Sequence, residues 1–182
     1  MPNKADARNK LGLRESDLVV ALMPGSRLSE IERHSSVFLR AGQEIQNTVG
    51  GRVRLLLGCS SAKYVQQLAS ILGGFNCEMI VGDSLTVLTA ADVAIVVSGT
   101  VTLECLLCDV PVVVAYRTSS INYRILKKLV KSRYIALPNI LTEMDLVPEL
   151  LQDEVSVKNL SKETLSWLSD ADRRNTFSLK GR

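Results

Sequence analysis

Five short apolar runs, each followed by residues with helical spacing, constrain the fold of this chain more than any other feature. The runs lie at residues 18–23, 53–57, 78–81, 93–97 and 112–115, and the helical stretches at residues 31–45, 62–72, 84–91 and 101–108. Short runs that are almost continuously apolar are typical of strands buried on both faces. Their alternation with helices predicts an α/β fold with a Rossmann-like, doubly wound parallel sheet and right-handed crossovers.

Local signals place some helix boundaries. Ser29 and Glu32 stand in the S-x-x-E relation of a capping box, which predicts that a helix begins there. A weaker helical stretch at residues 162–168 surrounds Trp167. Pro138 and Pro148 interrupt the region before it, so we expect turns there.

The size of the chain fits one domain. It has 182 residues, of which 46% are hydrophobic, enough to bury one substantial core. We expect a lead-in segment at residues 1–17, a Rossmann-like domain at residues 18–170, and a tail at residues 171–182. Because the tail has little apolar content, we expect it to be frayed.

Composition excludes several functions. The net charge of +3 is modest and the basic residues are scattered, which does not indicate a nucleic-acid partner. The four cysteines lie in or beside apolar runs, as in a reduced cytoplasmic protein. Cys105 and Cys108 form a C-x-x-C pair, but no second pair accompanies it and His34 is the only histidine, so we expect no metal. Polar residues follow Met1 and no apolar run is long enough to cross a bilayer, so we expect neither a secretory leader nor a membrane-spanning segment.

Ligands of open parallel sheets bind beyond the carboxyl ends of the strands, so the residues that follow each apolar run are the informative ones. Three segments stand out, at residues 24–27, 98–104 and 116–117, and a fourth lies at residues 137–139.

The segment from Ser98 to Glu104 places small residues and Gly99 where a strand turns into a helix. Free backbone N–H groups there favour phosphate binding, although Ser98 and Thr100 equally fit ordinary helix caps. Glu104 lies among apolar neighbours, and its carboxylate can accept hydrogen bonds from the two hydroxyls of a ribose. An unpaired buried carboxylate is costly, so we expect Glu104 to have a partner.

Arg27 follows a Pro-Gly turn at the end of the first run. Its guanidinium can bind a diphosphate bidentately, and the alternative is an ordinary surface arginine. No D-x-D motif for Mg²⁺ occurs in the sheet-edge loops, and the chain contains neither a P-loop nor a G-x-G-x-x-G fingerprint. If a bound diphosphate is the leaving group of a reaction, cationic side chains rather than a metal ion would therefore stabilise its negative charge.

Residues 121–131 form an amphipathic helical pattern with a basic face. Arg124, Lys127, Lys128 and Lys131 make up that face. One interpretation is contact with anionic lipid headgroups at a membrane surface, and the other is a solvated helix face.

Five segments occur in the order and at the spacing of a known family. They are LMPGSR (22–27), AADVAIVVSGTVTLE (90–104), PVVVAYR (111–117), LVKSRYIALPNIL (129–141) and VPELLQDE (147–154). Together they closely resemble the C-terminal half of lipid-A-disaccharide synthases, which are two-domain glycosyltransferases of the GT-B fold. The resemblance covers about residues 18–159.

The resemblance implies an inverting, metal-independent reaction without a cofactor. A 2,3-diacylglucosamine unit passes from UDP-2,3-diacylglucosamine to the lipid acceptor 2,3-diacylglucosamine 1-phosphate, and UDP leaves. Arg27 would contact the diphosphate and stabilise the leaving group, Ser98, Gly99 and Thr100 the phosphate or uridine, and Glu104 the ribose. The full set that the resemblance assigns to the UDP-sugar site is Gly25, Ser26, Arg27, Ser98, Gly99, Thr100, Thr102, Glu104, Tyr116, Arg117, Asn139 and Gln152.

The N-terminal domain of that family has no counterpart in this sequence. The general base is expected from that missing half, so we expect the chain alone to be inactive. By resemblance the site of action is cytoplasmic, at the inner membrane's cytoplasmic face if the basic helix binds lipid. Alternatives are another UDP-sugar enzyme of GT-B shape, such as a UDP-N-acetylglucosamine epimerase or the peptidoglycan N-acetylglucosaminyltransferase, and a non-catalytic nucleotide-binding fragment.

Overall fold

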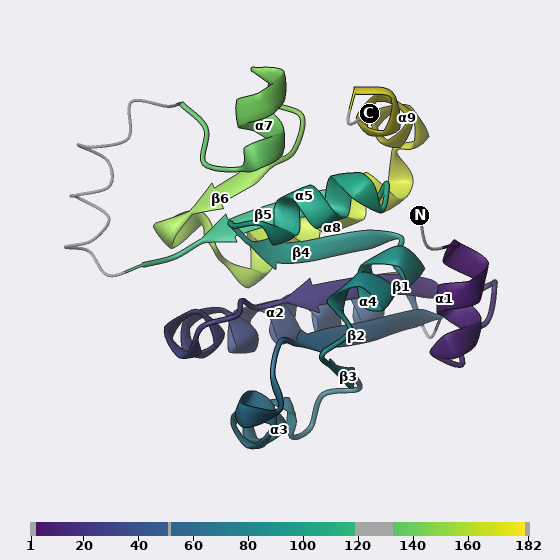
Figure 1. Ribbon diagram of the computed structural model, residues 1–182, viewed down its shortest axis with the longest axis vertical. Helices are drawn as coiled ribbons and strands as arrows, with labels where there is room; N and C mark the ends of the chain where they lie inside the picture. The colour runs from purple at the N-terminus through teal and green to yellow at the C-terminus, as the bar shows by residue number, and fades with distance from the viewer. Residues whose placement is uncertain (1–2, 51, 119–132, 181–182) are drawn as a thin grey trace.

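A six-stranded parallel sheet forms the centre of the molecule (Figure 1). The computed structural model describes residues 3–50, 52–118 and 133–180. The strands lie in the order β3-β2-β1-β4-β5-β6, and every neighbouring pair is parallel. Their bounds are β1 Leu18–Met23, β2 Val53–Cys59, β3 Glu78–Val81, β4 Val93–Val97, β5 Val112–Tyr116 and β6 Glu149–Leu151. The predicted α/β fold with a doubly wound parallel sheet is confirmed.

Helices cover both faces of the sheet. On one face α2 (Leu28–Val49) packs against α8 (Val157–Ser169), with α3 (Val65–Leu72) beside α2. On the other face lie α4 (Ser84–Ala90) and α5 (Val101–Leu107), which contact α1 (Lys4–Lys10) and α7 (Leu137–Thr142) respectively. The remaining elements are α9 (Ala171–Lys180) and the 3-10 turns Ala62–Tyr64 and Gln152–Glu154.

The two central strands are the most buried part of the core. Every residue of β4 is buried, as is all of β1 after its first residue, because helices cover both faces there. In the edge strand β3, the two middle residues are partly buried and the two end residues are exposed. The continuous apolar runs of the sequence thus correspond to strands enclosed from both sides.

The expected capping box at Ser29 and Glu32 is wrong. Helix α2 begins at Leu28, with Arg27 as its N-cap residue. The carboxylate of Glu30, at the third helical position, accepts hydrogen bonds from the backbone N–H groups of Ser26 (2.9 Å) and Arg27 (3.2 Å). The chain therefore turns into the helix earlier than the Ser29 pattern indicates.

Structure is present at both ends of the described chain. In the expected lead-in segment, the guanidinium of Arg8 in α1 donates to the carbonyl of Ala90 (3.1 Å) and to Asp92 Oδ2 (2.8 Å). Asp92 Oδ2 also accepts from the N–H of Val19, so this cluster joins α1 to the start of β1. The division of the chain at residues 17 and 170 stays a prediction.

Residues 171–180 form helix α9 rather than the frayed tail that we expected. Phe177 is buried and meets Trp167 of α8 edge-on, with ring centroids 5.7 Å apart. The indole Nε1 of Trp167 donates to the carbonyl of Val112 (3.1 Å), and the guanidinium of Arg173 lies 4.0 Å from the ring centroid. The packing of Phe177 on Trp167 thus holds α9 in place, although the segment contains few apolar residues. No helix in the described residues is long and apolar enough to cross a membrane.

Candidate functional site

A cleft of about 410 Å³ opens at the carboxyl edge of the sheet, beside β1 and β4. The chain leaves these two adjacent strands toward opposite faces, because α2 follows β1 and α5 follows β4. Such a reversal of strand order opens a crevice in which ligands of α/β proteins bind. The predicted residues that line this cleft are Gly25, Ser26, Arg27, Ser98, Gly99, Thr100 and Glu104.

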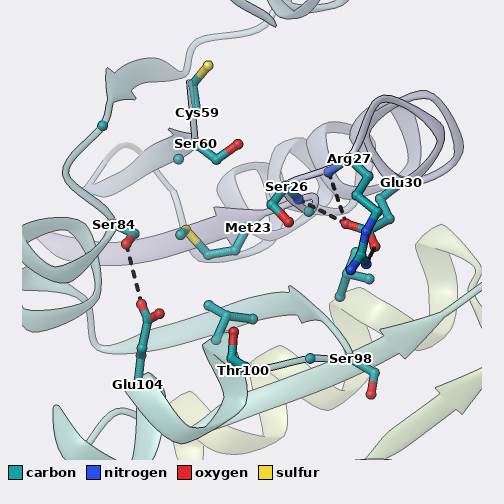
Figure 2. Close-up of a pocket in the computed structure, with 16 residues that line it drawn as sticks. Met23, Ser26, Arg27, Glu30, Cys59, Ser60, Ser84, Ser98, Thr100 and Glu104 are labelled. Carbon is teal, nitrogen blue, oxygen red and sulfur yellow. Dashed lines mark hydrogen bonds and ion pairs between the residues drawn. The ribbon is translucent and has the colours of Figure 1, made fainter. Parts of the chain in front are cut away.

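The loop after β1 is shaped around Glu30. Gly25 has a φ of +117°, which L side chains rarely adopt, and a Cβ built there would lie 2.5 Å from the Cβ of Glu30. Arg27 Nη1 donates to Glu30 Oε1 (2.7 Å), and 78% of the Arg27 side chain is exposed. Figure 2 shows the contacts that join Glu30 to Ser26 and Arg27. Arg27 is thus an exposed cation at the cleft with one acidic partner.

In the turn after β4, side-chain hydrogen bonds hold the loop in place, while the backbone on the cleft side stays accessible. The hydroxyl of Thr102 donates to the carbonyl of Gly99 (2.7 Å), and that of Ser98 to the carbonyl of Ile135 (3.0 Å). A Cβ built on Gly99 would meet nothing within 4 Å, so its backbone is accessible from the cleft. Thr102 is fully buried below the turn. A ligand at this turn therefore meets backbone and the side chain of Thr100, while Ser98 and Thr102 secure the loop.

Glu104 is half-buried at the cleft and has a partner. The hydroxyl of Ser84, at the start of α4, donates to its Oε2 at 3.3 Å. Figure 2 shows the two side chains facing each other across the cleft wall. The expectation of a partner is met by a neutral hydroxyl, and within the described residues no cation forms an ion pair with Glu104, so its carboxylate can accept from further hydroxyl donors.

Five predicted site residues lie outside the lining of this cleft: Thr102, below the turn after β4, and Tyr116, Arg117, Asn139 and Gln152. Asn139 is buried in α7, where its amide donates to the carbonyl of Val147 and to Glu149 Oε1 (both 2.8 Å). Arg117 donates from Nε to the carbonyl of Gln152 (3.3 Å). Together with Tyr116, the last residue of β5, these residues belong to the region around β5 and β6. Their contact with the nucleotide sugar stays a prediction.

The basic face made by Arg124, Lys127, Lys128 and Lys131 lies outside the described residues. Its two interpretations, membrane contact and solvated surface, both stay predictions. Among the residues that are described, no three of His, Cys, Asp and Glu lie together as a metal-binding group.

Sequence reasoning missed part of the lining. The additional residues are Met23, Glu30, Gly58, Cys59, Ser60, Gly82, Ser84, Val97 and Val101. Most of them stand directly at the carboxyl ends of β2 and β3 or in the first turn of the next helix. The same positional rule that identified residues 24–27 and 98–104 would have found Gly58, Cys59, Ser60 and Gly82, which lie at or directly after the ends of β2 and β3.

His34 links the first turn of α2, which follows β1, to the residue after the end of β5. Its Nε2 accepts from the N–H of Arg117 (3.1 Å), so its Nδ1 carries the proton and donates to the carbonyl of Glu30 (2.8 Å). Burial lowers the pKa of His34, and the charges of Arg117 and Arg33 act in the same direction, against the opposing hydrogen bond to Glu30. The imidazole is therefore a neutral link between α2 and the end of β5.

Comparison with known proteins gives a consistent result. A family model described as lipid-A-disaccharide synthetase matches residues 1–181. The lipid-A-disaccharide synthase of Pseudomonas fluorescens (strain SBW25) is 44% identical over 181 residues, which are 97% of this chain and 47% of that protein. That of Pseudomonas aeruginosa (strain UCBPP-PA14) is 41% identical over 178 residues, 96% of this chain and 47% of that protein. The chain thus spans about half the length of the curated relatives it matches.

Solved structures with little sequence similarity share the fold. WaaG, a glycosyltransferase of lipopolysaccharide biosynthesis, has a TM-score of 0.63 at 18% identity, covering 100% of this chain and 46% of that one. The ADP-heptose heptosyltransferase II of E. coli has a TM-score of 0.62 at 12% identity, covering 91% and 50%. MnaA of S. aureus, solved with UDP, has a TM-score of 0.59 at 13% identity, covering 98% and 43%.

Proposed function

The chain belongs to the lipid-A-disaccharide synthetase family, and we propose that it is the part of such an enzyme that binds the sugar nucleotide. The proposed donor is UDP-2,3-diacylglucosamine, and the proposed acceptor is 2,3-diacylglucosamine 1-phosphate. In this proposal the chain holds the UDP moiety and stabilises it as the leaving group.

The observation that carries the proposal is the convergence of Arg27, the Ser98–Thr100 turn and Glu104 on one cleft. They are a cation, an open backbone turn and a carboxylate, the groups that a diphosphate and a ribose require. Arg27 receives the diphosphate, the turn contacts phosphate or uridine, and Glu104 accepts hydrogen bonds from the ribose hydroxyls. UDP in the structure of MnaA supports the choice of ligand, since that protein has the same fold.

The proposed leaving-group stabilisation uses protein groups in place of a metal ion. As the bond between the sugar and UDP breaks, negative charge develops on the diphosphate. A guanidinium is planar, permanently charged and able to hold two phosphate oxygens at once. Donors placed where charge develops lower a barrier by about 2.7 to 4 kcal/mol each in known enzymes. Arg27 is the residue at the cleft with this chemistry.

The relatives are about twice as long as this chain, and we propose that their other half supplies the acceptor site and the general base. Transfer requires a base within hydrogen-bond reach of the acceptor hydroxyl. The proposed location is the cytoplasmic face of a membrane, since both substrates carry acyl chains. The basic face at Arg124, Lys127, Lys128 and Lys131 is the proposed peripheral contact, on the strength of its sequence pattern.

Calorimetric titration with UDP in the presence of EDTA tests the proposal. We expect binding without added metal, and Arg27→Ala should weaken it about tenfold or more. Arg40→Ala is the matched control, because Arg40 is an exposed arginine of α2 outside the cleft lining. A folded chain that binds no UDP contradicts the proposed site, and binding that requires Mg²⁺ contradicts the metal-free mechanism.

A further inference from the structure

Glu30 accepts hydrogen bonds from three donors of the loop after β1, which lines the cleft. Its Oε2 accepts from the backbone N–H groups of Ser26 (2.9 Å) and Arg27 (3.2 Å), and its Oε1 accepts from Arg27 Nη1 (2.7 Å). The carboxylate thus fixes both the backbone of the loop and the direction of its cation. Figure 2 shows these contacts on one side of the cleft.

The loop and Glu30 fit each other closely. At Gly25 an added Cβ would lie 2.5 Å from both Cβ and Oε2 of Glu30, so the backbone passes against the carboxylate. Partial burial opposes ionisation of Glu30, but hydrogen bonds from Ser26 and Arg27 outweigh it and hold the pKa of the carboxyl below its ordinary value. Glu30 is therefore ionised at neutral pH, with its charge directed at Arg27.

Arg27 needs such a partner to be oriented. With 78% of its side chain exposed, it has little packing to select one rotamer, and ordering a long side chain on ligand binding costs conformational entropy. In the described part of the chain, Glu30 is the only acceptor that contacts the Arg27 guanidinium. A guanidinium has five N–H donors, so this contact leaves donors for a ligand phosphate.

We propose that Glu30 is a positioning residue of the anion site, which holds the Ser26–Arg27 backbone and the Arg27 guanidinium in the arrangement that receives the diphosphate. This inference rests on the proposed function. Glu30 does not contact the ligand in this scheme and acts through Arg27. The opposing scheme is that the carboxylate only competes with the phosphates for the same donors, and the two schemes predict opposite signs for its removal.

The test is a double-mutant cycle on UDP affinity with Glu30→Gln, Arg27→Ala and the combined variant. The glutamine can still accept from the backbone N–H groups, but it presents an NH₂ group to Arg27. We expect Glu30→Gln to weaken UDP about tenfold in the parent chain and less than about twofold in the Arg27→Ala background. Uridine, which has no phosphate, should bind the parent and Glu30→Gln equally.

Glu32→Gln is the matched control, because it removes the same charge two residues further along α2, outside the cleft lining. We expect it to leave UDP affinity unchanged. Tighter or unchanged UDP binding by Glu30→Gln, additive losses in the cycle, or an equal loss of uridine affinity would each overturn the positioning role. A parent chain that binds no UDP instead overturns the proposed function, and this inference with it.

A second measurement needs no variant. In the unliganded parent chain, the amide hydrogens of Ser26 and Arg27 should exchange with solvent at least about tenfold more slowly than unstructured amides, because Glu30 accepts from both. Exchange at the rate of an unstructured loop would show that the carboxylate does not hold the backbone, and it would overturn the inference even if Glu30→Gln fails to fold.

Discussion

In the part of the chain that the structure describes, Glu104 is a half-buried carboxylate that accepts a hydrogen bond from the neutral hydroxyl of Ser84. If Glu104 binds the ribose, it contributes to UDP affinity through hydrogen bonds from the ribose hydroxyls to its charged carboxylate. We predict that Glu104→Ala weakens UDP about tenfold while the free energy of unfolding changes little. Calorimetry with 2′-deoxy-UDP separates the two roles, because the variant should lose less affinity for this ligand. Equal losses for both ligands, accompanied by lower stability, would indicate a structural glutamate.

His34 predicts a pH dependence of stability. Burial lowers its pKa in the folded chain, whereas the unfolded chain has the ordinary value of about 6.5. Below that pH the unfolded state binds the proton more readily, so the free energy of unfolding should fall as the pH drops below about 6.5. Above about pH 6.5, the contribution of the neutral His34 to stability is fully present. Urea unfolding between pH 7.5 and pH 5 measures this effect.

The matched variant for this prediction is His34→Gln, whose amide can replace one hydrogen bond and does not titrate. Its stability should change less than that of the parent over the same pH range. The same slope in both proteins would assign the pH dependence to other groups. Because the chain has one histidine, the imidazole resonances in NMR report its protonation without ambiguity.

At single positions, the sequence indicated side chains by their place after strands. Arg27 and Glu104 were found in this way, and both line the cleft. Glu30 and Ser84 were not, because their relevance comes from a contact with another residue that spacing alone does not reveal. Asn139 illustrates the converse: a motif residue whose hydrogen bonds are all made inside the protein.

Among the elements, α9 is the one whose stability is most easily tested. Phe177 is its single buried side chain and packs on Trp167. We predict that Phe177→Ala lowers the free energy of unfolding by about 3 kcal/mol, the lower end for such truncations because a terminal helix can relax. Leu179→Ala is the control, since that side chain is 78% exposed and should change stability by less than about 0.5 kcal/mol. Urea denaturation measures both, and equal effects would contradict the docking of α9.

The strength of local pattern explains which elements could be predicted. Strands such as Val93–Val97 are continuous apolar runs, and their burial on both faces follows from that pattern. The three-residue strand β6 (Glu149–Leu151) has no such pattern, and it forms because β5 offers a free edge beside it. Helix α7 begins at Leu137, where Pro138 suggested a turn, but a proline in the first helical turn costs no hydrogen bond.

For the whole molecule, the proposed division of labour between two halves determines what this chain alone should be able to catalyse. Positioning two reactants contributes about 7 to 11 kcal/mol to catalysis in well-oriented cases, and the proposed acceptor site lies in the other half of the relatives. We predict that this chain alone forms no lipid A disaccharide from the proposed donor and acceptor at saturating concentrations. A radiolabelled donor and chromatography of the products measure this.

Addition of the remaining half of a relative, as a fusion, should restore turnover. Arg27→Ala in that fusion should then lower turnover by about 100-fold, with Arg40→Ala unchanged. Disaccharide synthesis by the chain alone would place an acceptor site and a base within these 182 residues, and the proposed division of labour would be wrong.

The position of Trp167 decides what an optical experiment on this protein can measure. It is the chain's only tryptophan. It is buried against Phe177 of α9, donates a hydrogen bond to the carbonyl of Val112, and does not line the cleft. Its emission should therefore change when α9 detaches and stay nearly constant when a ligand enters the cleft. A fluorescence titration that returns a flat line would say nothing about nucleotide affinity, while the same signal in a melting curve would follow the carboxyl-terminal helix directly.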